Sequence, residues 1–199
     1  FYVPGTVPDF TVTGPSTSFR IKGLSAQLGS FKNLKNGVSF DLPNSQGSPL
    51  FLITERKLSM AGRLETLSSL DGQLQDARLV KLKNGGQKWV FAYSLQGGEI
   101  HVRGELECGD AELIRGRLWI EYGGNDEIVS VDYPLLSNLA IGGNAKEDTL
   151  ILPFTQGMKV PHPAAQSFAS PRYWTWPGSL SMGYVDLYNT NRNAGLYLA

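Results

Sequence analysis

Strict alternation of apolar and polar residues in the middle of the chain limits what this sequence can fold into. Along residues 99–108 the apolar side chains fall on one phase and the polar side chains on the other. A period of two residues is typical of a β-strand with one buried face. The preceding residues 87–95 are apolar on both phases, which indicates a strand covered on both faces. The apolar phase of the first segment consists of Ile100, Val102, Leu106 and Cys108, and its polar phase of Glu99, His101, Arg103, Glu105 and Glu107.

Turn residues separate further segments of the same kind. Glycines at 97–98, 109 and 123–124 stand between stretches with strand-like alternation. This spacing predicts a meander of long antiparallel strands over residues 74–82, 87–95, 100–108, 114–122 and 128–133. Shorter strands are predicted at 18–22, 37–41 and 50–54, and a helix is conceivable only at 56–70.

The glycines and prolines distributed along the chain favour an all-β fold. The 199 residues include 23 glycines and 11 prolines. Short, evenly spaced strands with glycine-rich turns are typical of two packed sheets. We therefore expect one large antiparallel β-sandwich domain spanning residues 1–199.

The last residues predict a β-hairpin. Apolar stretches at 181–188 and 194–199 flank the polar turn at 189–193. Because free termini usually tolerate polar sequence, we expect this chain to be the N-terminal part of a longer protein.

The charge balance narrows the choice of partners. Lysine plus arginine and aspartate plus glutamate number 18 each, so the formal net charge is zero. A nucleic-acid binder or an anionic-membrane binder needs a basic surface, so we expect neither partner. A neutral ligand such as a carbohydrate fits better. Cys108 is the single cysteine, so no internal disulfide is possible, and its apolar phase predicts a buried structural thiol.

Motifs for catalysis or cofactor binding are missing from the sequence. It has no G-x-S-x-G elbow and no phosphate-binding glycine loop. His101 and His162 lack the neighbours of a zinc site, and we expect no metal and no cofactor. Asp132 and Asp186 match the paired carboxylates of glycoside hydrolysis only in residue type, because a charge between apolar strand residues is more typical of an outer face.

The best candidate for ligand recognition is a loop bounded by prolines. Its aromatic rings could stack on the apolar faces of sugars, with polar side chains nearby reading the hydroxyl groups. Alternatively, the rings seal a domain interface or cap the core. Trp119, on the polar phase of its strand, predicts a second packing layer or a neighbouring domain. The candidate substrate-binding residues are Trp174, Trp176, Tyr173, Arg172 and His162.

The C-terminal third carries a family resemblance. The motifs are Val-Asp-Tyr-Pro at 131–134, Asp-Thr-Leu-Ile-Leu-Pro at 148–153, Pro-Gly at 177–178, Ser-Met at 181–182 and Gly-Leu-Tyr-Leu at 195–198. In this order, residues 127–199 resemble the N-terminal super-β-sandwich (galactose-mutarotase-like) domain of uncharacterised bacterial glycoside hydrolases. The resemblance implies an all-β domain packed on a C-terminal catalytic barrel that supplies the acid and the nucleophile, so no catalytic residue is assigned to this chain. It also implies an extracellular or periplasmic location.

We therefore expect a non-catalytic domain of a glycoside hydrolase that packs on the catalytic barrel and lends the loops at 157–163 and 172–177 to the glycan pocket. One alternative is an independent carbohydrate-binding module that uses Trp174 and Trp176. Another is a mutarotase-like or epimerase-like enzyme, in which His101 and His162 would have to converge. A purely structural domain of a surface protein is the last alternative.

Overall fold

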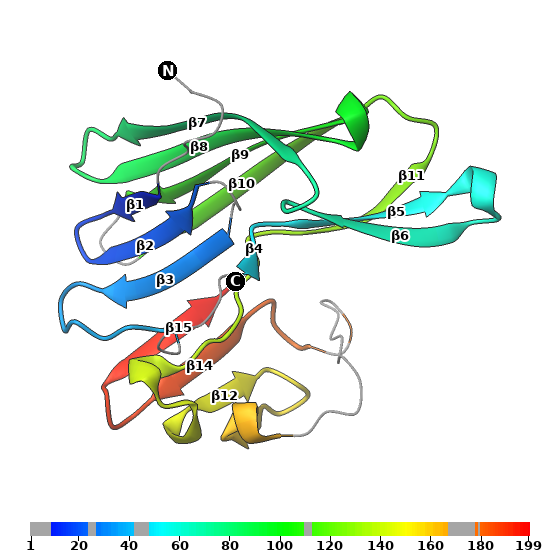
Figure 1. Ribbon diagram of the computed structural model, residues 1–199. Helices are drawn as coiled ribbons and strands as arrows, with labels where there is room; N and C mark the ends of the chain where they lie inside the picture. Colours follow the sequence, from blue (N-terminus) through cyan, green and yellow to red (C-terminus); the bar gives the residue numbers. More distant parts are fainter. Residues whose placement is uncertain (1–8, 24–26, 42–47, 110–112, 167–177, 179) are drawn as a thin grey trace. The chain divides into compact units, whose positions relative to one another are not determined.

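The computed structural model describes residues 9–23, 27–41, 48–109, 113–166, 178 and 180–199. Within these residues the regular elements are β-strands and short 3-10 turns, without an α-helix. The all-β prediction is therefore confirmed. The chain divides into two compact units: unit 1 comprises Phe1–Asn36 and Gln46–Ser137, and unit 2 comprises Gly37–Ser45 and Asn138–Ala199. Unit 1 holds three antiparallel sheets and unit 2 holds one (Figure 1).

The first sheet of unit 1 is built by the N-terminal strands, in chain order. Val12, Phe19 and Ile21 alternate with exposed or half-buried residues, so one face of this sheet enters the core. Phe19 contacts Phe31 across two strands, with ring centroids 5.9 Å apart. The strands are β1 (Phe10–Thr13), β2 (Thr17–Lys22), β3 (Gln27–Asn33) and β4 (Ser48–Pro49).

The second sheet contains four of the five strands predicted for the meander, in the order β10-β9-β8-β7. Trp89, Phe91 and Tyr93 on β8 are buried, whereas Val90 and Ala92 on the opposite phase are only half-buried, so the second face of this strand is less covered than predicted. Gly104 on β9 lies opposite Phe91, and a Cβ at this position would overlap the Phe91 ring. The absence of a side chain at Gly104 therefore makes room for this ring. The strands are β7 (Gln73–Lys81), β8 (Gln87–Leu95), β9 (Ile100–Cys108) and β10 (Arg115–Tyr122), and η2 (Gln96–Gly98) joins β8 to β9.

The third sheet has the order β11-β5-β6, from β5 (Leu52–Lys57), β6 (Arg63–Ser68) and β11 (Glu127–Asp132). In Figure 1, β5 and β6 run side by side as a long hairpin that ends at η1 (Leu58–Met60). The helix considered at 56–70 is thus wrong. Ala61 and Gly62 both have positive φ and reverse the chain, so that Lys57 pairs with Arg63. The fifth meander strand is also misplaced by the prediction, because β11 pairs with β5.

Aromatic rings from the three sheets meet in the core of unit 1. Phe10 of β1 lies 5.9 Å from Trp89 of β8, between ring centroids. Phe51, directly before β5, meets Tyr93 edge to face at 5.7 Å. Burial of such large apolar surfaces is the main stabilising contribution to a fold of this size.

The sheet of unit 2 has the order β13-β12-β14-β15, and its last two strands are the predicted C-terminal hairpin. The strand predicted at 37–41 is reduced to a single bridge between Asp41 and Leu139. The strands are β12 (Thr149–Leu152), β13 (Met158–Pro161), β14 (Val185–Asn189) and β15 (Ala194–Leu198), and the 3-10 turns are η3 (Ile141–Gly143), η4 (Ala145–Glu147) and η5 (Pro163–Ala165).

The predicted large β-sandwich, and with it the supersandwich architecture of the galactose-mutarotase kind, is wrong. The described strands form four small antiparallel sheets of three or four strands each, where a large sandwich needs two extended sheets. Alternation and glycine-rich turns specify hairpins, but they do not specify which hairpins share a sheet. The single domain over residues 1–199 stays a prediction.

Candidate functional site

Of the predicted substrate-binding residues, only His162 lies in the described part of the chain. Arg172, Tyr173, Trp174 and Trp176 lie outside the described residues. His162 is exposed, has a φ of 51°, and directly precedes η5. Its backbone N–H donates to the Asp148 carbonyl oxygen at 2.9 Å. Its Nδ1 bonds the Lys146 carbonyl oxygen, so Nδ1 carries the proton. These bonds hold the turn before η5.

The other residues singled out from the sequence do not form one cluster. His101 is exposed on β9, opposite Glu121, in unit 1, whereas His162 belongs to unit 2. Asp132 and Asp186 are likewise in different units. Trp119 is 53% exposed, which confirms its outward phase. Within the described residues, no group of three or more His, Cys, Asp or Glu side chains is placed to hold a metal ion.

One face of the unit 2 sheet carries three tyrosines, and we call it the tyrosine face (Lys159, Tyr184, Asp186, Tyr188 and Tyr197). The rings of Tyr184 and Tyr197 are stacked, with centroids 5.1 Å apart and planes 25° apart. Tyr197 is 61% exposed. Asp186 on β14 lies directly opposite Tyr197 on β15, so the two side chains share this face.

Polar groups complete the tyrosine face. The Lys159 Nζ lies 5.8 Å from the centroid of the Tyr188 ring, which is a cation–π distance. Asp186 has no hydrogen bond or ion pair with any described residue. Gly195 stands opposite Tyr188, and a Cβ there would lie 3.6 Å from Asp186 Oδ1. The missing side chain therefore leaves access to the Asp186 carboxylate.

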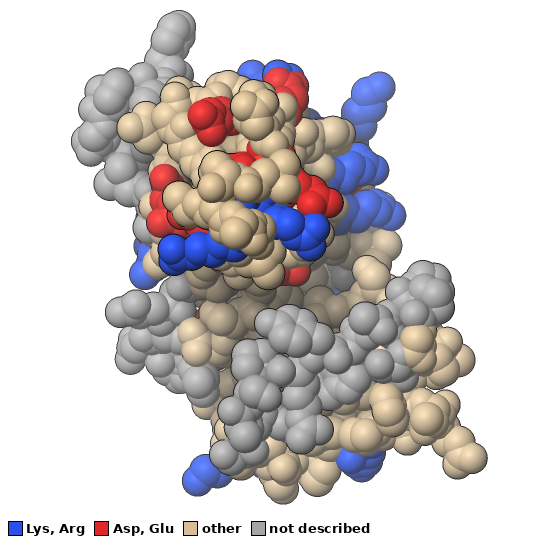
Figure 2. All heavy atoms as spheres, turned by 90° about the vertical axis from the view of Figure 1, so that its right-hand side faces the viewer, with Lys and Arg blue, Asp and Glu red and all other residues tan. Residues whose placement is uncertain are grey.

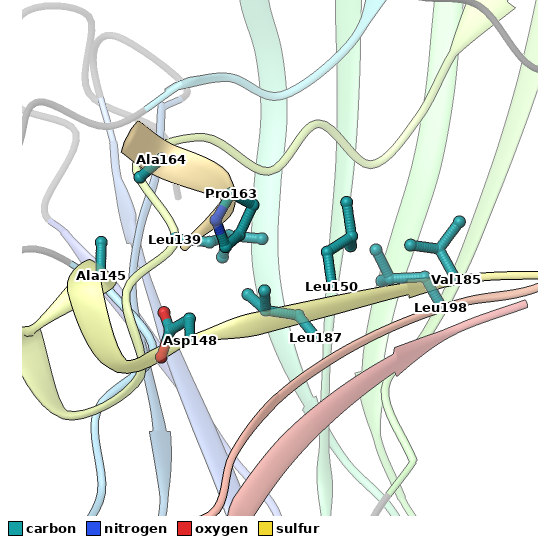
Figure 3. A pocket seen from close by; sticks show the side chains of 9 residues that line it. All are labelled: Leu139, Ala145, Asp148, Leu150, Pro163, Ala164, Val185, Leu187 and Leu198. Carbon is teal, nitrogen blue, oxygen red and sulfur yellow. The ribbon is translucent and has the colours of Figure 1, made fainter. Parts of the chain in front are cut away.

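The opposite face of the same sheet forms an apolar pocket of about 210 Å³ (Figure 3). Asp148 is its one charged lining residue, and both carboxylate oxygens are engaged: Ile141 N–H donates to Oδ2 at 3.0 Å and Asn189 Nδ2 to Oδ1 at 2.9 Å. Pockets for organic ligands usually measure about 300–1,000 Å³, so this one is small. It is lined by Leu139, Ala145, Asp148, Leu150, Pro163, Ala164, Val185, Leu187 and Leu198.

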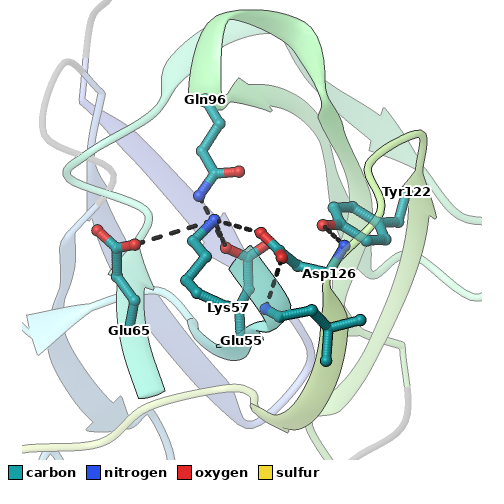
Figure 4. A network of polar contacts seen from close by, with 7 residues as sticks. Glu55, Lys57, Glu65, Gln96, Tyr122 and Asp126 are labelled. Atoms are coloured by element: carbon teal, nitrogen blue, oxygen red, sulfur yellow. Dashed lines mark hydrogen bonds and ion pairs between the residues drawn. The ribbon is translucent and has the colours of Figure 1, made fainter. Parts of the chain in front are cut away.

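Unit 1 contains a charged network around Lys57 (Figure 4). The Lys57 Nζ lies 2.7 Å from Glu55 Oε2 and 3.1 Å from Asp126 Oδ2, and Glu55 is fully buried. The hydrogen bond to Glu55 is the main cause that raises the pKa of Lys57. The hydrogen bond from Lys57 lowers the pKa of Asp126. Both shifts favour the charged forms of Lys57 and Asp126, so the ion pair between these two residues persists at neutral pH.

Backbone and amide groups extend the network. Gln96 Nε2 donates to Glu55 Oε2 at 2.7 Å, and the Leu58 N–H donates to Asp126 Oδ1 at 2.9 Å. The Tyr122 hydroxyl accepts the Asp126 N–H at 2.9 Å. The network thus joins the β5–β6 hairpin to the turns before β9 and β11, and its role is to stabilise the fold.

Sequence reasoning missed both clusters, although each leaves a signal. Glu55 follows Phe51 and Ile53 on the buried phase of its strand, where a charge requires a partner. Tyr184, Asp186 and Tyr188 share one phase of the segment predicted as the first strand of the C-terminal hairpin. A polar, aromatic phase next to an apolar one predicts a solvent-facing aromatic surface.

Comparison with models of protein families, with curated proteins and with solved structures found no match to this chain. The described residues include no helix with the length and apolar character needed to cross a bilayer.

Proposed function

We propose that this chain is a non-catalytic domain of a glycoside hydrolase, which packs on the catalytic barrel of the same polypeptide and contributes to its glycan pocket. The packing on another domain is supported by the exposed apolar side chains at the end of the β5–β6 hairpin. Leu58, Met60 and Leu64 are 59%, 57% and 56% exposed, although all three are large apolar side chains. Apolar side chains gathered at an exposed position mark a surface for another protein domain.

Charged side chains border this hairpin end, as at many domain interfaces. Arg56 pairs with Glu127 at 2.7 Å on the neighbouring strand. Figure 2 faces the side on which the hairpin ends in Figure 1, and there uncharged residues lie among Lys, Arg, Asp and Glu side chains. A polar border around apolar contacts is the usual composition of an interface and fixes its register.

The carbohydrate part of the proposal rests on the residue types of the proline-bounded loop, which lies outside the described residues. In this proposal the aromatic residues Tyr173, Trp174 and Trp176 supply stacking surfaces for the glycan, and Arg172 and His162 supply polar groups. An extracellular or periplasmic location belongs to the same proposal.

Hydrogen exchange tests the packing step. The 199-residue chain is compared with the full polypeptide encoded by the natural gene. We expect slower exchange over the β5–β6 hairpin in the full polypeptide, because a docked domain excludes water from its amides. Substituting Leu58→Ser together with Met60→Ser should abolish this protection, whereas Leu79→Ser, which also replaces an exposed leucine (41%), should leave it intact. Equal exchange in both proteins, or a gene that encodes no further domain, contradicts the proposal.

A further inference from the structure

The tyrosine face belongs to unit 2, whereas the β5–β6 hairpin end belongs to unit 1. Tyr197 is exposed, and the ring of Tyr184 stacks against its ring. The stack fixes the orientation of the Tyr197 ring before any ligand arrives, which lowers the entropic cost of binding. The ring is therefore a prepared flat apolar surface on the edge strand β15.

A hydrogen-bond acceptor lies beside this ring. Asp186 is the cross-strand neighbour of Tyr197, is half-buried, and has no partner among the described residues. An ionised carboxylate has two oxygens that accept hydrogen bonds, and such bonds are stronger than those between neutral groups. The open position at Gly195, whose absent Cβ would lie 3.6 Å from Asp186 Oδ1, leaves room for a donor to reach it.

We propose that the tyrosine face binds a neutral saccharide, with one sugar ring stacked on Tyr197 and its hydroxyl groups donating to the Asp186 carboxylate. A sugar ring presents polarised C–H groups on a flat face, and these suit the negative face of an aromatic ring. Its hydroxyl groups lie at the ring edge, where the carboxylate stands. The choice of a saccharide rests on the proposed function, whereas the location rests on the geometry of this face alone.

The charges of the face favour a neutral ligand over a nucleic acid. Asp186 would repel a phosphate backbone, and Lys159 is the one cation that the described residues contribute to this face. Lys159 is also positioned over Tyr188, so it covers that ring and leaves the Tyr197 ring as the open stacking surface. Nucleic-acid sites need several cations that neutralise successive phosphates.

Calorimetric and NMR titrations of the 199-residue chain with a panel of neutral oligosaccharides test this inference. The panel includes β-linked and α-linked glucose, galactose, mannose and xylose oligomers at up to ~10 mM, a range that detects weak binding. We expect at least one of them to bind and to shift the amide signals of β14 and β15. Tyr197→Ala should weaken binding about tenfold, since it removes the stacking surface, whereas Tyr197→Phe should change it less than about twofold.

Two further variants test the acceptor without removing the ring. Asp186→Asn keeps the shape but removes the charge and should weaken binding roughly tenfold. Gly195→Ala should weaken it about threefold, because the added methyl group narrows access to Asp186. Trp119→Ala, an exposed aromatic residue of unit 1, is the matched control and should leave the affinity unchanged.

Three results would overturn the inference. The first is that no oligosaccharide of the panel binds, and the second is that binding survives both Tyr197→Ala and Asp186→Asn. The third is that the face binds peptides or oligonucleotides in place of saccharides. None of them changes the hydrogen-exchange result for the β5–β6 hairpin, so failure of this inference and failure of the proposed domain packing are distinguishable.

Discussion

The Cys108 thiol lies fully buried on β9 and accepts a hydrogen bond from the Thr17 hydroxyl at 3.6 Å. Burial is the main cause that raises the pKa of Cys108 from 9.0 to about 11, because the thiolate loses its hydration there. A thiolate is the reactive form of cysteine, so this side chain is inert at neutral pH. The apolar phase of residues 99–108 predicts this burial correctly.

The raised pKa of Cys108 makes stability depend on pH in the alkaline range. Above pH 9 the unfolded chain loses the thiol proton while the folded chain keeps it, so this contribution is complete below pH 9 and is lost as the pH rises through about 11. We expect the free energy of unfolding of the wild type to fall by roughly 2 kcal/mol relative to Cys108→Ala over this range. Urea unfolding at several pH values measures it. Tyrosines also titrate in this pH range, but they are common to both proteins and cancel in the comparison. If the two curves of unfolding free energy against pH run parallel, the pH dependence does not come from Cys108.

The β5–β6 hairpin shows at the level of an element how one lysine stabilises a buried carboxylate. Glu55 has no exposed surface, and its Oε2 is shared by Lys57 and Gln96, while Oε1 has no hydrogen-bond partner among the described residues. An unpaired buried charge is costly, so removing the lysine does more harm than removing both partners.

Substituting Lys57→Met should therefore lower the free energy of unfolding by about 3 kcal/mol, and adding Glu55→Gln should recover part of this loss. Urea unfolding of both single variants and the double variant gives the coupling energy. Arg56→Ala is the control, because its pair with Glu127 is solvent-exposed and contributes no more than about 1 kcal/mol. Additive effects of the two substitutions would show that Glu55 does not depend on Lys57.

At the same scale, the sequence predicts strands better than it predicts their neighbours. The apolar segment at 87–95 and the alternation at 99–108 locate β8 and β9, because these patterns record burial, which is a local property of each residue. The membership of β11 in the sheet with β5 and β6 depends on pairing between segments far apart in the chain, such as Glu127 with Arg56, and no local pattern encodes it. The tyrosine face is a different case, because its two strands are consecutive and are predicted as a hairpin. The polar turn at 189–193 does not fix the register that sets Asp186 opposite Tyr197.

At the scale of the whole molecule, unit 2 is assembled from two separate parts of the chain. Residues 37–45 join it from the N-terminal region, and the rest begins at Asn138. Backbone hydrogen bonds join these two parts. The Ala140 N–H donates to the Phe40 carbonyl oxygen at 3.0 Å, and the Gly142 N–H donates to the Ser39 carbonyl oxygen at 2.7 Å. Phe40 itself is buried. Unit 2 is therefore built in part from a segment about 100 positions earlier in the sequence.

This construction of unit 2 predicts a selective effect of Phe40→Ala. Truncating a buried phenylalanine costs about 3–5 kcal/mol, and here the loss belongs to unit 2, because Phe40 is part of that unit. We expect faster hydrogen exchange in β12 and β14 with little change in β8 and β9, as measured by mass spectrometry on the native protein. Leu74→Ala, which truncates a buried leucine of unit 1, should give the opposite distribution. Equal acceleration in both units after either substitution would mean that the two units unfold as one cooperative body, in which case residues 37–45 stabilise the whole chain and not the C-terminal sheet in particular.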